Sequence, residues 1–178
     1  MLPKAIVELN LCRGAEASGS RIGESTDETF ALVDAEATRR FGAELAKHLP
    51  RGAILLLQGD LGAGKTCLVQ GMAEAMGIDE PITSPTFALA QHYLSGHQPL
   101  VHLDLYRLET PGSADELFLQ EEEEARAIGA VLAVEWPERL SINLPEAWRL
   151  TLEYKGDGRQ AELSPPQTGN RDNAPWPR

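Results

Sequence analysis

Hydrophobic residues follow two different periods in the first third of the chain. The alternating segment 29–33 predicts a strand, and Asp34 behind it is a residue type that caps helices. In the helix expected over residues 35–49, apolar residues recur at every fourth position from Phe41, which predicts one buried stripe. Residues 53–58 are apolar on both faces, as is typical of a central parallel strand.

A glycine-rich turn and a second helix follow. Leu68, Met72 and Met76 recur at a spacing of four and are expected to face inward, and Gly77 is expected to end the helix. The later elements are two strands joined as a hairpin (87–94 and 99–106), an acidic helix (113–128), a doubly buried strand (130–134) and two late strands (148–154 and 160–163). Strands that alternate with helices early, with a hairpin later, predict a three-layer α/β domain with a mixed β-sheet.

The length fits one domain, because two independent cores in 178 residues would each be near the lower limit for autonomous folding. We place this domain at residues 29–164. Residues 1–28 show neither period and are expected to form a flexible extension. Residues 165–178 contain four prolines and are expected to form a disordered tail.

The composition of the chain indicates the cellular compartment in which the protein is expected. The longest apolar runs have five residues, whereas a membrane span needs roughly 18. The N-terminus has no apolar stretch typical of a secretory signal, and two cysteines are too few for a disulfide framework or a zinc site. We therefore expect a cytoplasmic protein without membrane contact.

The charge of the chain disfavours direct binding of nucleic acid. Lys and Arg number 16 against 27 Asp and Glu, which gives a formal charge of −11, and the phosphate backbone favours basic surfaces. Seven of the acids fall within residues 109–124, where there is no Lys or Arg. This acidic segment predicts a solvated helix face, with a docking surface for a basic partner as the alternative.

The strongest motif lies between the strand 53–58 and the second helix. Residues 59–66 are Gly-Asp-Leu-Gly-Ala-Gly-Lys-Thr and match G-x-x-x-x-G-K-[ST] in full. Glycines let backbone N–H groups face phosphate oxygens, and the helix start adds a partial positive charge. Lys65 brings a charge to the β- and γ-phosphates, and the Thr66 hydroxyl is an oxygen ligand suited to Mg²⁺. Cys67 follows, where a small buried residue is expected rather than a redox group.

A Mg²⁺ site beside Thr66 also needs a carboxylate at the end of a neighbouring strand. Glu135 ends the doubly buried strand and is the first candidate. Asp104 follows residues 100–103 in the second strand of the predicted hairpin, and it has two interpretations: a catalytic role and a cap of the following turn. His102 alternates with its neighbours and is expected to be a half-buried strand residue rather than a general base.

Three further short sequence segments, together with this motif, have the order and spacing of a known family. They are Ser84-Pro85-Thr86-Phe87, His102-Leu103-Asp104-Leu105-Tyr106-Arg107-Leu108 and Val134-Glu135-Trp136-Pro137. Over about residues 29–160 the chain resembles TsaE, the bacterial ATPase family of tRNA threonylcarbamoyladenosine biosynthesis. The resemblance implies a small P-loop NTPase-like fold that binds ATP with Mg²⁺ and works with TsaD and TsaB. Those partners transfer threonylcarbamoyl to an adenosine beside the anticodon, so tRNA is met only through them, and ATP hydrolysis resets their complex.

The resemblance also implies roles for single residues. The magnesium ligands fall on Thr66 and Glu135, and the catalytic residues on Asp104, Lys65 and Thr86. Thr86 would lie in the loop that senses the terminal phosphate, with a plain Pro-stiffened turn as the alternative. The residues expected to bind ATP are Ala35, Gly59, Gly62, Ala63, Gly64, Lys65, Thr66, Cys67 and Trp136. For Trp136, packing is the alternative.

Two other classes of protein use the same phosphate loop. A small-molecule kinase needs a lid of arginines over the donor phosphates, and Arg107, Arg126, Arg139 and Arg149 are scattered along the chain. A nucleotide-gated binding module without catalysis is favoured only if Asp104 is irrelevant. Arg107 lies just past Asp104 and is expected to be a structural ion-pair partner.

Overall fold

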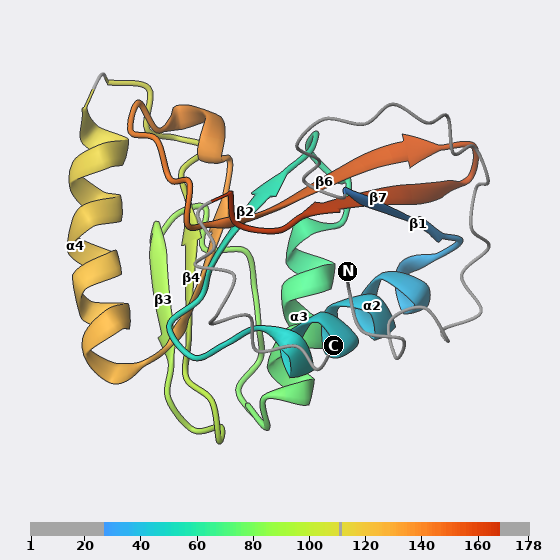
Figure 1. The fold of residues 1–178 in the computed structure, drawn as a ribbon, viewed down its shortest axis with the longest axis horizontal. Coiled ribbons are helices and arrows are strands. Elements are labelled where there is room, and N and C mark those ends of the chain that lie inside the picture. Colours follow the sequence, from blue (N-terminus) through green and yellow to red (C-terminus); the bar gives the residue numbers. More distant parts are fainter. Residues whose placement is uncertain (1–26, 111, 168–178) are drawn as a thin grey trace.

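The structure is a computed structural model that describes residues 27–110 and 112–167 (Figure 1). Seven strands form one sheet in the order β1-β7-β6-β2-β5-β4-β3. The strands are β1 (Glu28–Leu32), β2 (Ile54–Gln58), β3 (Ala90–Tyr93), β4 (Leu100–Asp104), β5 (Val131–Glu135), β6 (Trp148–Lys155) and β7 (Gly158–Ser164). The helices are α2 (Ala35–His48), α3 (Lys65–Ala75), α4 (Ser113–Ile128) and the short 3-10 helix η1 (Pro137–Arg139).

The centre of the sheet is parallel and its edges are antiparallel. The four strands β6, β2, β5 and β4 run in one direction. At one edge β3 pairs antiparallel with β4, and at the other β7 pairs antiparallel with β6 and β1. Both neighbours of β2 therefore come from later parts of the chain: Leu55 is in register with Ala133 of β5 and with Trp148 of β6.

Helices cover both faces of this sheet (Figure 1). On one face Leu55 and Leu57 of β2 join a core formed with α2 and α3, and on the other Ile54 and Leu56 join a core that includes α4. Side chains of a strand alternate between faces, so an apolar strand supplies both cores. The predicted three-layer α/β domain with a mixed sheet is confirmed.

The two helices of the first core are packed backbone against backbone. A Cβ atom on Gly42 of α2 would lie 2.2 Å from the carbonyl oxygen of Leu68. One on Gly71 of α3 would lie 2.0 Å from the carbonyl oxygen of Arg39. A larger residue at either position would clash, because backbone atoms cannot move aside as a flexible side chain can. The two glycines therefore let α2 pack closely against the helix that follows the phosphate loop.

Several local predictions hold, with small shifts at element ends. Asp34 caps α2 as expected, and its Oδ1 accepts a hydrogen bond from the Ala37 amide at 2.7 Å. Glu28, which we placed in the N-terminal extension, opens β1. The rest of the predicted extension and most of the predicted tail fall on residues 1–26 and 168–178, outside the described residues.

The segment before β3 differs from the prediction. The sequence predicts a strand from Phe87, but β3 begins at Ala90. A turn intervenes, in which the Leu89 amide donates to the Pro85 carbonyl oxygen at 2.6 Å and Leu89 has a left-handed φ of 68°. Phe87 is 88% exposed, so the start of the apolar run that suggested a strand lies in this turn, outside β3.

The acidic helix occupies the predicted residues, but its acidic segment is not simply a solvated face. Its buried positions are Ala114, Phe118, Glu121 and Ala125, and these follow the helical spacing of a core stripe. Glu121 is only 6% exposed. The prediction is wrong at this residue, because the run of four glutamates crosses the buried side of the helix. Within the described residues, no helix combines the length and apolar character needed to cross a membrane.

Candidate functional site

The turn after β2 wraps around the start of α3. Gly59 has a φ of +142°, and a Cβ atom there would lie 2.4 Å from the carbonyl oxygen of Leu152. Gly64 has a φ of +110° and is the N-cap of α3. Because glycine has no side chain to cap the first helical turn, the amide groups there are left for an anion.

Lys65 folds back onto this turn. Its Nζ donates hydrogen bonds to the carbonyl oxygens of Gly59 at 2.6 Å and Asp60 at 3.1 Å, and lies 4.3 Å from the centre of the Trp136 ring. Burial lowers the pKa of Lys65, and the opposing attraction of Glu135 is the smaller effect. A phosphate oxygen would give this buried ammonium a charged partner in place of two neutral carbonyls.

Glu135 connects α3 to the centre of the sheet. Its Oε1 accepts a hydrogen bond from the Thr66 hydroxyl at 2.9 Å. The same oxygen lies 2.9 Å from Nε2 of His102. The structure therefore brings the two predicted metal ligands together, and both offer the oxygen ligands that Mg²⁺ prefers.

His102 is not the half-buried residue that the alternating pattern predicts. Its exposed fraction is 0%, because β4 lies inside the sheet and both faces are covered. Its Nδ1 has no hydrogen-bond partner among the described residues. With its proton on Nε2, His102 donates a hydrogen bond to Oε1 of Glu135. His102 thereby orients the Glu135 carboxylate.

Asp104 holds the loop that precedes β3. Its Oδ2 accepts hydrogen bonds from the hydroxyls of Thr86 at 2.6 Å and Ser84 at 3.1 Å. Its Oδ1 accepts from the Tyr106 amide at 2.9 Å, which is the turn cap that the sequence offers as one interpretation. The catalytic interpretation stays a prediction. Sequence reasoning gave Ser84 no role, although its place two residues before Thr86 was a usable signal.

The two carboxylates meet in one cleft. Asp104 and Glu135 are in register on the parallel strands β4 and β5, and they lie at the carboxyl ends of these strands, where α/β sheets place their ligands. The cleft has a volume of about 270 Å³. The predicted site residues that line it are Gly62, Gly64, Lys65, Thr66, Cys67, Thr86, Asp104, Glu135 and Trp136.

Three predicted ATP-binding residues are not in the lining of the cleft: Gly59, Ala63 and Ala35. Ala63 is 1% exposed. Ala35 opens α2, and its carbonyl oxygen accepts a hydrogen bond from the Cys67 thiol at 3.3 Å. Their contacts with a nucleotide stay predictions.

Cys67 is partly exposed at the cleft, rather than buried as expected. Burial of part of its surface is the largest cause that raises the pKa of its thiol. The protonated thiol is therefore favoured, which lowers its reactivity toward oxidants.

Aromatic side chains border the Lys65 side of the cleft. The rings of Trp136 and Tyr106 lie 4.8 Å apart. Trp136 has a left-handed φ of 60°, which is uncommon for a bulky residue. Trp136 packs on a neighbouring ring and also lines the cleft, and its contact with a nucleotide stays a prediction.

A hairpin from the end of the domain holds the phosphate loop from outside. The Tyr154 hydroxyl of β6 donates to the Leu61 carbonyl oxygen at 3.2 Å, and Nε of Arg159 in β7 donates to that of Ala63 at 3.2 Å. These partners are 93 and 96 residues apart in the chain. Sequence reasoning missed both residues, because no local pattern signals such contacts.

Arg107 differs from its predicted role. Within the described residues no acidic group lies within 4.0 Å of it. Its guanidinium instead lies 5.0 Å from the centre of the exposed Phe87 ring. Among the described residues, no arginine lines the cleft.

The fold and the cleft together define a P-loop NTPase-like domain: a buried strand, a complete phosphate-loop motif, a helix, and two acids at the ends of adjacent strands. A comparison with protein families agrees and is more specific. The family model "Threonylcarbamoyl adenosine biosynthesis protein TsaE" matches residues 32–162. The chain belongs to the TsaE family and so to tRNA threonylcarbamoyladenosine biosynthesis.

Individual relatives support this assignment. The tRNA threonylcarbamoyladenosine biosynthesis protein TsaE of Nostoc sp. is 45% identical over 136 residues, 75% of this chain and 83% of the relative. The protein of the same name from Synechocystis sp. is 50% identical over 113 residues, 62% of this chain and 71% of the relative. The crystal structure of YdiB from Bacillus subtilis superposes with a TM-score of 0.64 at 30% identity, and covers 82% of this chain and 88% of that chain.

Proposed function

We propose that the chain is a cytoplasmic, Mg²⁺-dependent ATP hydrolase that acts as an accessory factor by cycling a TsaD–TsaB complex. That complex would modify the tRNA adenosine beside the anticodon. The observation that carries the proposal is the register pairing of Asp104 and Glu135 opposite Lys65 and Thr66 in one cleft. P-loop hydrolases need one acid on the metal side and a group that orients the attacking water.

The residues of the cleft fit ATP and Mg²⁺. The turn around Gly64 offers amide groups to the phosphates, and Lys65 adds a buried positive charge. Thr66 and Glu135 have their oxygens 2.9 Å apart and would hold Mg²⁺, directly or through water. Bound Mg²⁺ neutralises charge that develops on phosphate oxygens.

Asp104 would orient the water. Its carboxylate is 2% exposed and is held by the hydroxyls of Ser84 and Thr86. The loop that carries these hydroxyls is therefore tied to the carboxylate that the reaction uses. A partner that fixes this loop would also fix Asp104 and the water.

We expect slow turnover by the isolated chain. An arginine that stabilises the transferring phosphoryl group is worth about 10³–10⁵ in rate, and no arginine of the described residues lines the cleft. TsaD and TsaB together should raise the rate at least about tenfold, by ordering the loop around Thr86 and the water.

The test is phosphate release at saturating ATP and Mg²⁺, by the chain alone and with TsaD and TsaB from the same organism. Asp104→Asn should abolish the stimulated rate, while calorimetry shows ATP still bound. Asp157→Asn is the matched control, because Asp157 lies in the exposed turn between β6 and β7. Fast turnover by the isolated chain, or no response to partners that bind, would contradict the mechanism.

The same experiment separates the alternatives. A non-catalytic, nucleotide-gated module would bind ATP and show no hydrolysis under any of these conditions. A small-molecule kinase is disfavoured, because the described residues provide no arginine lid over the phosphates.

A further inference from the structure

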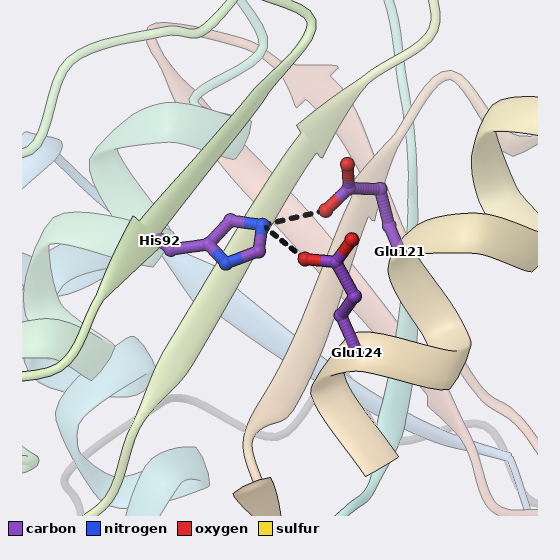
Figure 2. Close-up of side chains that lie close together, drawn as sticks. All are labelled: His92, Glu121 and Glu124. Carbon is purple, nitrogen blue, oxygen red and sulfur yellow. Dashed lines mark hydrogen bonds and ion pairs between the residues drawn. The ribbon is translucent and has the colours of Figure 1, made fainter. Parts of the chain in front are cut away.

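A second cluster of ligand-type side chains lies on the far face of the sheet from the phosphate loop. His92 of the edge strand β3 points toward α4, where Glu121 and Glu124 stand on successive turns (Figure 2). Nε2 of His92 lies 2.6 Å from Oε2 of Glu121 and 4.0 Å from Oε2 of Glu124. One ligand atom from each of the three residues lies within 4.8 Å of the others.

The position of Glu121 is the first sign that this cluster has a role. It occupies the buried stripe of α4 between Phe118 and Ala125, where a helix of a three-layer domain normally carries an apolar residue. Its side chain is only 8% exposed. A buried carboxylate is costly unless a positive charge or several donors compensate it.

The charges around the cluster do not supply that compensation. Within the described residues, no Lys or Arg lies within 4.0 Å of Glu121 or Glu124, and the one basic residue late in α4, Arg126, pairs with Glu122. His92 alone faces two carboxylates. Two carboxylates therefore face one imidazole, and a bound cation would balance their charge.

We infer that His92, Glu121 and Glu124 bind a divalent transition-metal ion of the Zn²⁺ type. An imidazole nitrogen with two carboxylate oxygens is a donor set that Zn²⁺ accepts, with three protein ligands and one open position. Bonds of about 2.0–2.2 Å in a tetrahedron place ligand atoms roughly 3.3 Å apart. The observed separations of 2.6 and 4.0 Å lie on either side of this value.

The cluster can adjust to a metal without disturbing the core. Glu124 is 52% exposed and His92 is 31% exposed, and the hydrogen bond to Glu124 from Gln120, between Nε2 and Oε1, is long at 3.5 Å. Both side chains can therefore shift by a few tenths of an ångström without displacing core residues. Glu121 is fixed on the buried stripe and sets the position of the ion. Because His92 and Glu124 are partly exposed, solvent could reach the open fourth position.

The ion would fasten the edge strand to the helix that covers it. β3 begins one residue after Leu89, whose carbonyl oxygen accepts a hydrogen bond from the Asp104 amide at 2.9 Å. The metal would therefore stabilise the outer edge of the sheet next to the loop of Ser84 and Thr86. This inference does not depend on the proposed hydrolysis of ATP.

The experiment titrates Zn²⁺ into the full chain after treatment with a chelator, in excess Mg²⁺, with calorimetry as the readout. One Zn²⁺ should bind per chain, and bound Co²⁺ should show the visible absorption of tetrahedral coordination. His92→Gln and Glu124→Gln should each weaken Zn²⁺ binding by about tenfold or more. The matched controls His97→Gln and Glu123→Gln, both at exposed positions outside the cluster, should bind as the wild type does.

Equal Zn²⁺ affinity in the wild type and in both cluster variants would overturn the inference, as would the absence of one-to-one binding. Either result would leave His92 and Glu121 as an ion pair without metal. If His92→Gln does not fold, Glu124→Gln decides alone, because Glu124 is half exposed and its replacement leaves the core intact.

Discussion

A close histidine–glutamate pair lies on each face of the sheet, and the two pairs differ in how they are held. On the α3 face, His102 and Glu135 are 2.9 Å apart with side chains 0% and 4% exposed. On the α4 face, His92 and Glu121 are 2.6 Å apart with side chains 31% and 8% exposed. The first pair joins two strands inside the sheet, and the second joins an edge strand to a helix.

This difference in surroundings gives the same residue types different uses. Glu135 is fixed by a second donor, the Thr66 hydroxyl, so its carboxylate has one orientation toward the cleft. Glu121 has no second donor among the described contacts, but has a second carboxylate beside it, that of the half-exposed Glu124, which is held by one long hydrogen bond from Gln120 at 3.5 Å. A rigid pair suits the positioning of a reacting group, whereas an adjustable pair suits the capture of an ion.

The largest effect is expected at the inner pair. Glu135→Ala should lower Mg²⁺-dependent ATP hydrolysis by about a hundredfold or more, while ATP binding falls much less, since the carboxylate acts through the metal. The rate should also respond more weakly to added Mg²⁺. Glu123→Ala, on the exposed side of α4, should keep the wild-type rate. A wild-type rate and metal response in Glu135→Ala would transfer the metal role to Asp104.

The two histidines should differ in their contribution to stability. His102→Ala leaves a cavity in a fully buried position and should lower the free energy of unfolding by about 2 kcal/mol or more. His92→Ala, without metal, should lower it less, because His92 is partly exposed and its removal leaves no fully buried cavity. Urea unfolding of the metal-free proteins measures both, and equal losses would show that the pairs are held alike.

The smallest effect is expected at the buried carboxylate of the outer pair. Glu121→Leu places an apolar residue on the stripe of α4 and should raise the stability of the metal-free protein by about 1 kcal/mol. The same variant should lose the stabilisation that Zn²⁺ gives the wild type. Thermal unfolding with and without Zn²⁺ tests this. A large loss of stability without metal would mean that Glu121 serves the fold rather than an ion.

The phosphate loop and its two acids were predictable from sequence because their signals are local. The motif of residues 59–66 is contiguous, and Glu135 and Asp104 each end a strand that its apolar residues reveal. The three-layer fold followed from the order of these elements. Their approach to one cleft follows from parallel pairing, which places the carboxyl ends of strands together.

The contacts that sequence analysis missed depend on packing between distant segments. Full burial of His102 requires neighbours on both sides of β4, which its own alternating pattern does not reveal. The position of Glu121 was partly visible, because it completes the spacing of Ala114, Phe118 and Ala125. The four adjacent glutamates concealed it, since a charged run usually indicates a solvated surface. Arg159 had no sequence signal at all.

The place of β2 in the sheet has a consequence for how the protein is made. β2 pairs with β5 and β6, and β5 begins only at Val131. Translation at about 5–20 residues per second therefore leaves β2 and the loop behind it without their sheet neighbours for several seconds. During that time an apolar strand has two open edges, which invites association with other chains. A nascent chain that stops before residue 131 is expected to need a chaperone and to bind no nucleotide, even though its phosphate-loop motif is complete.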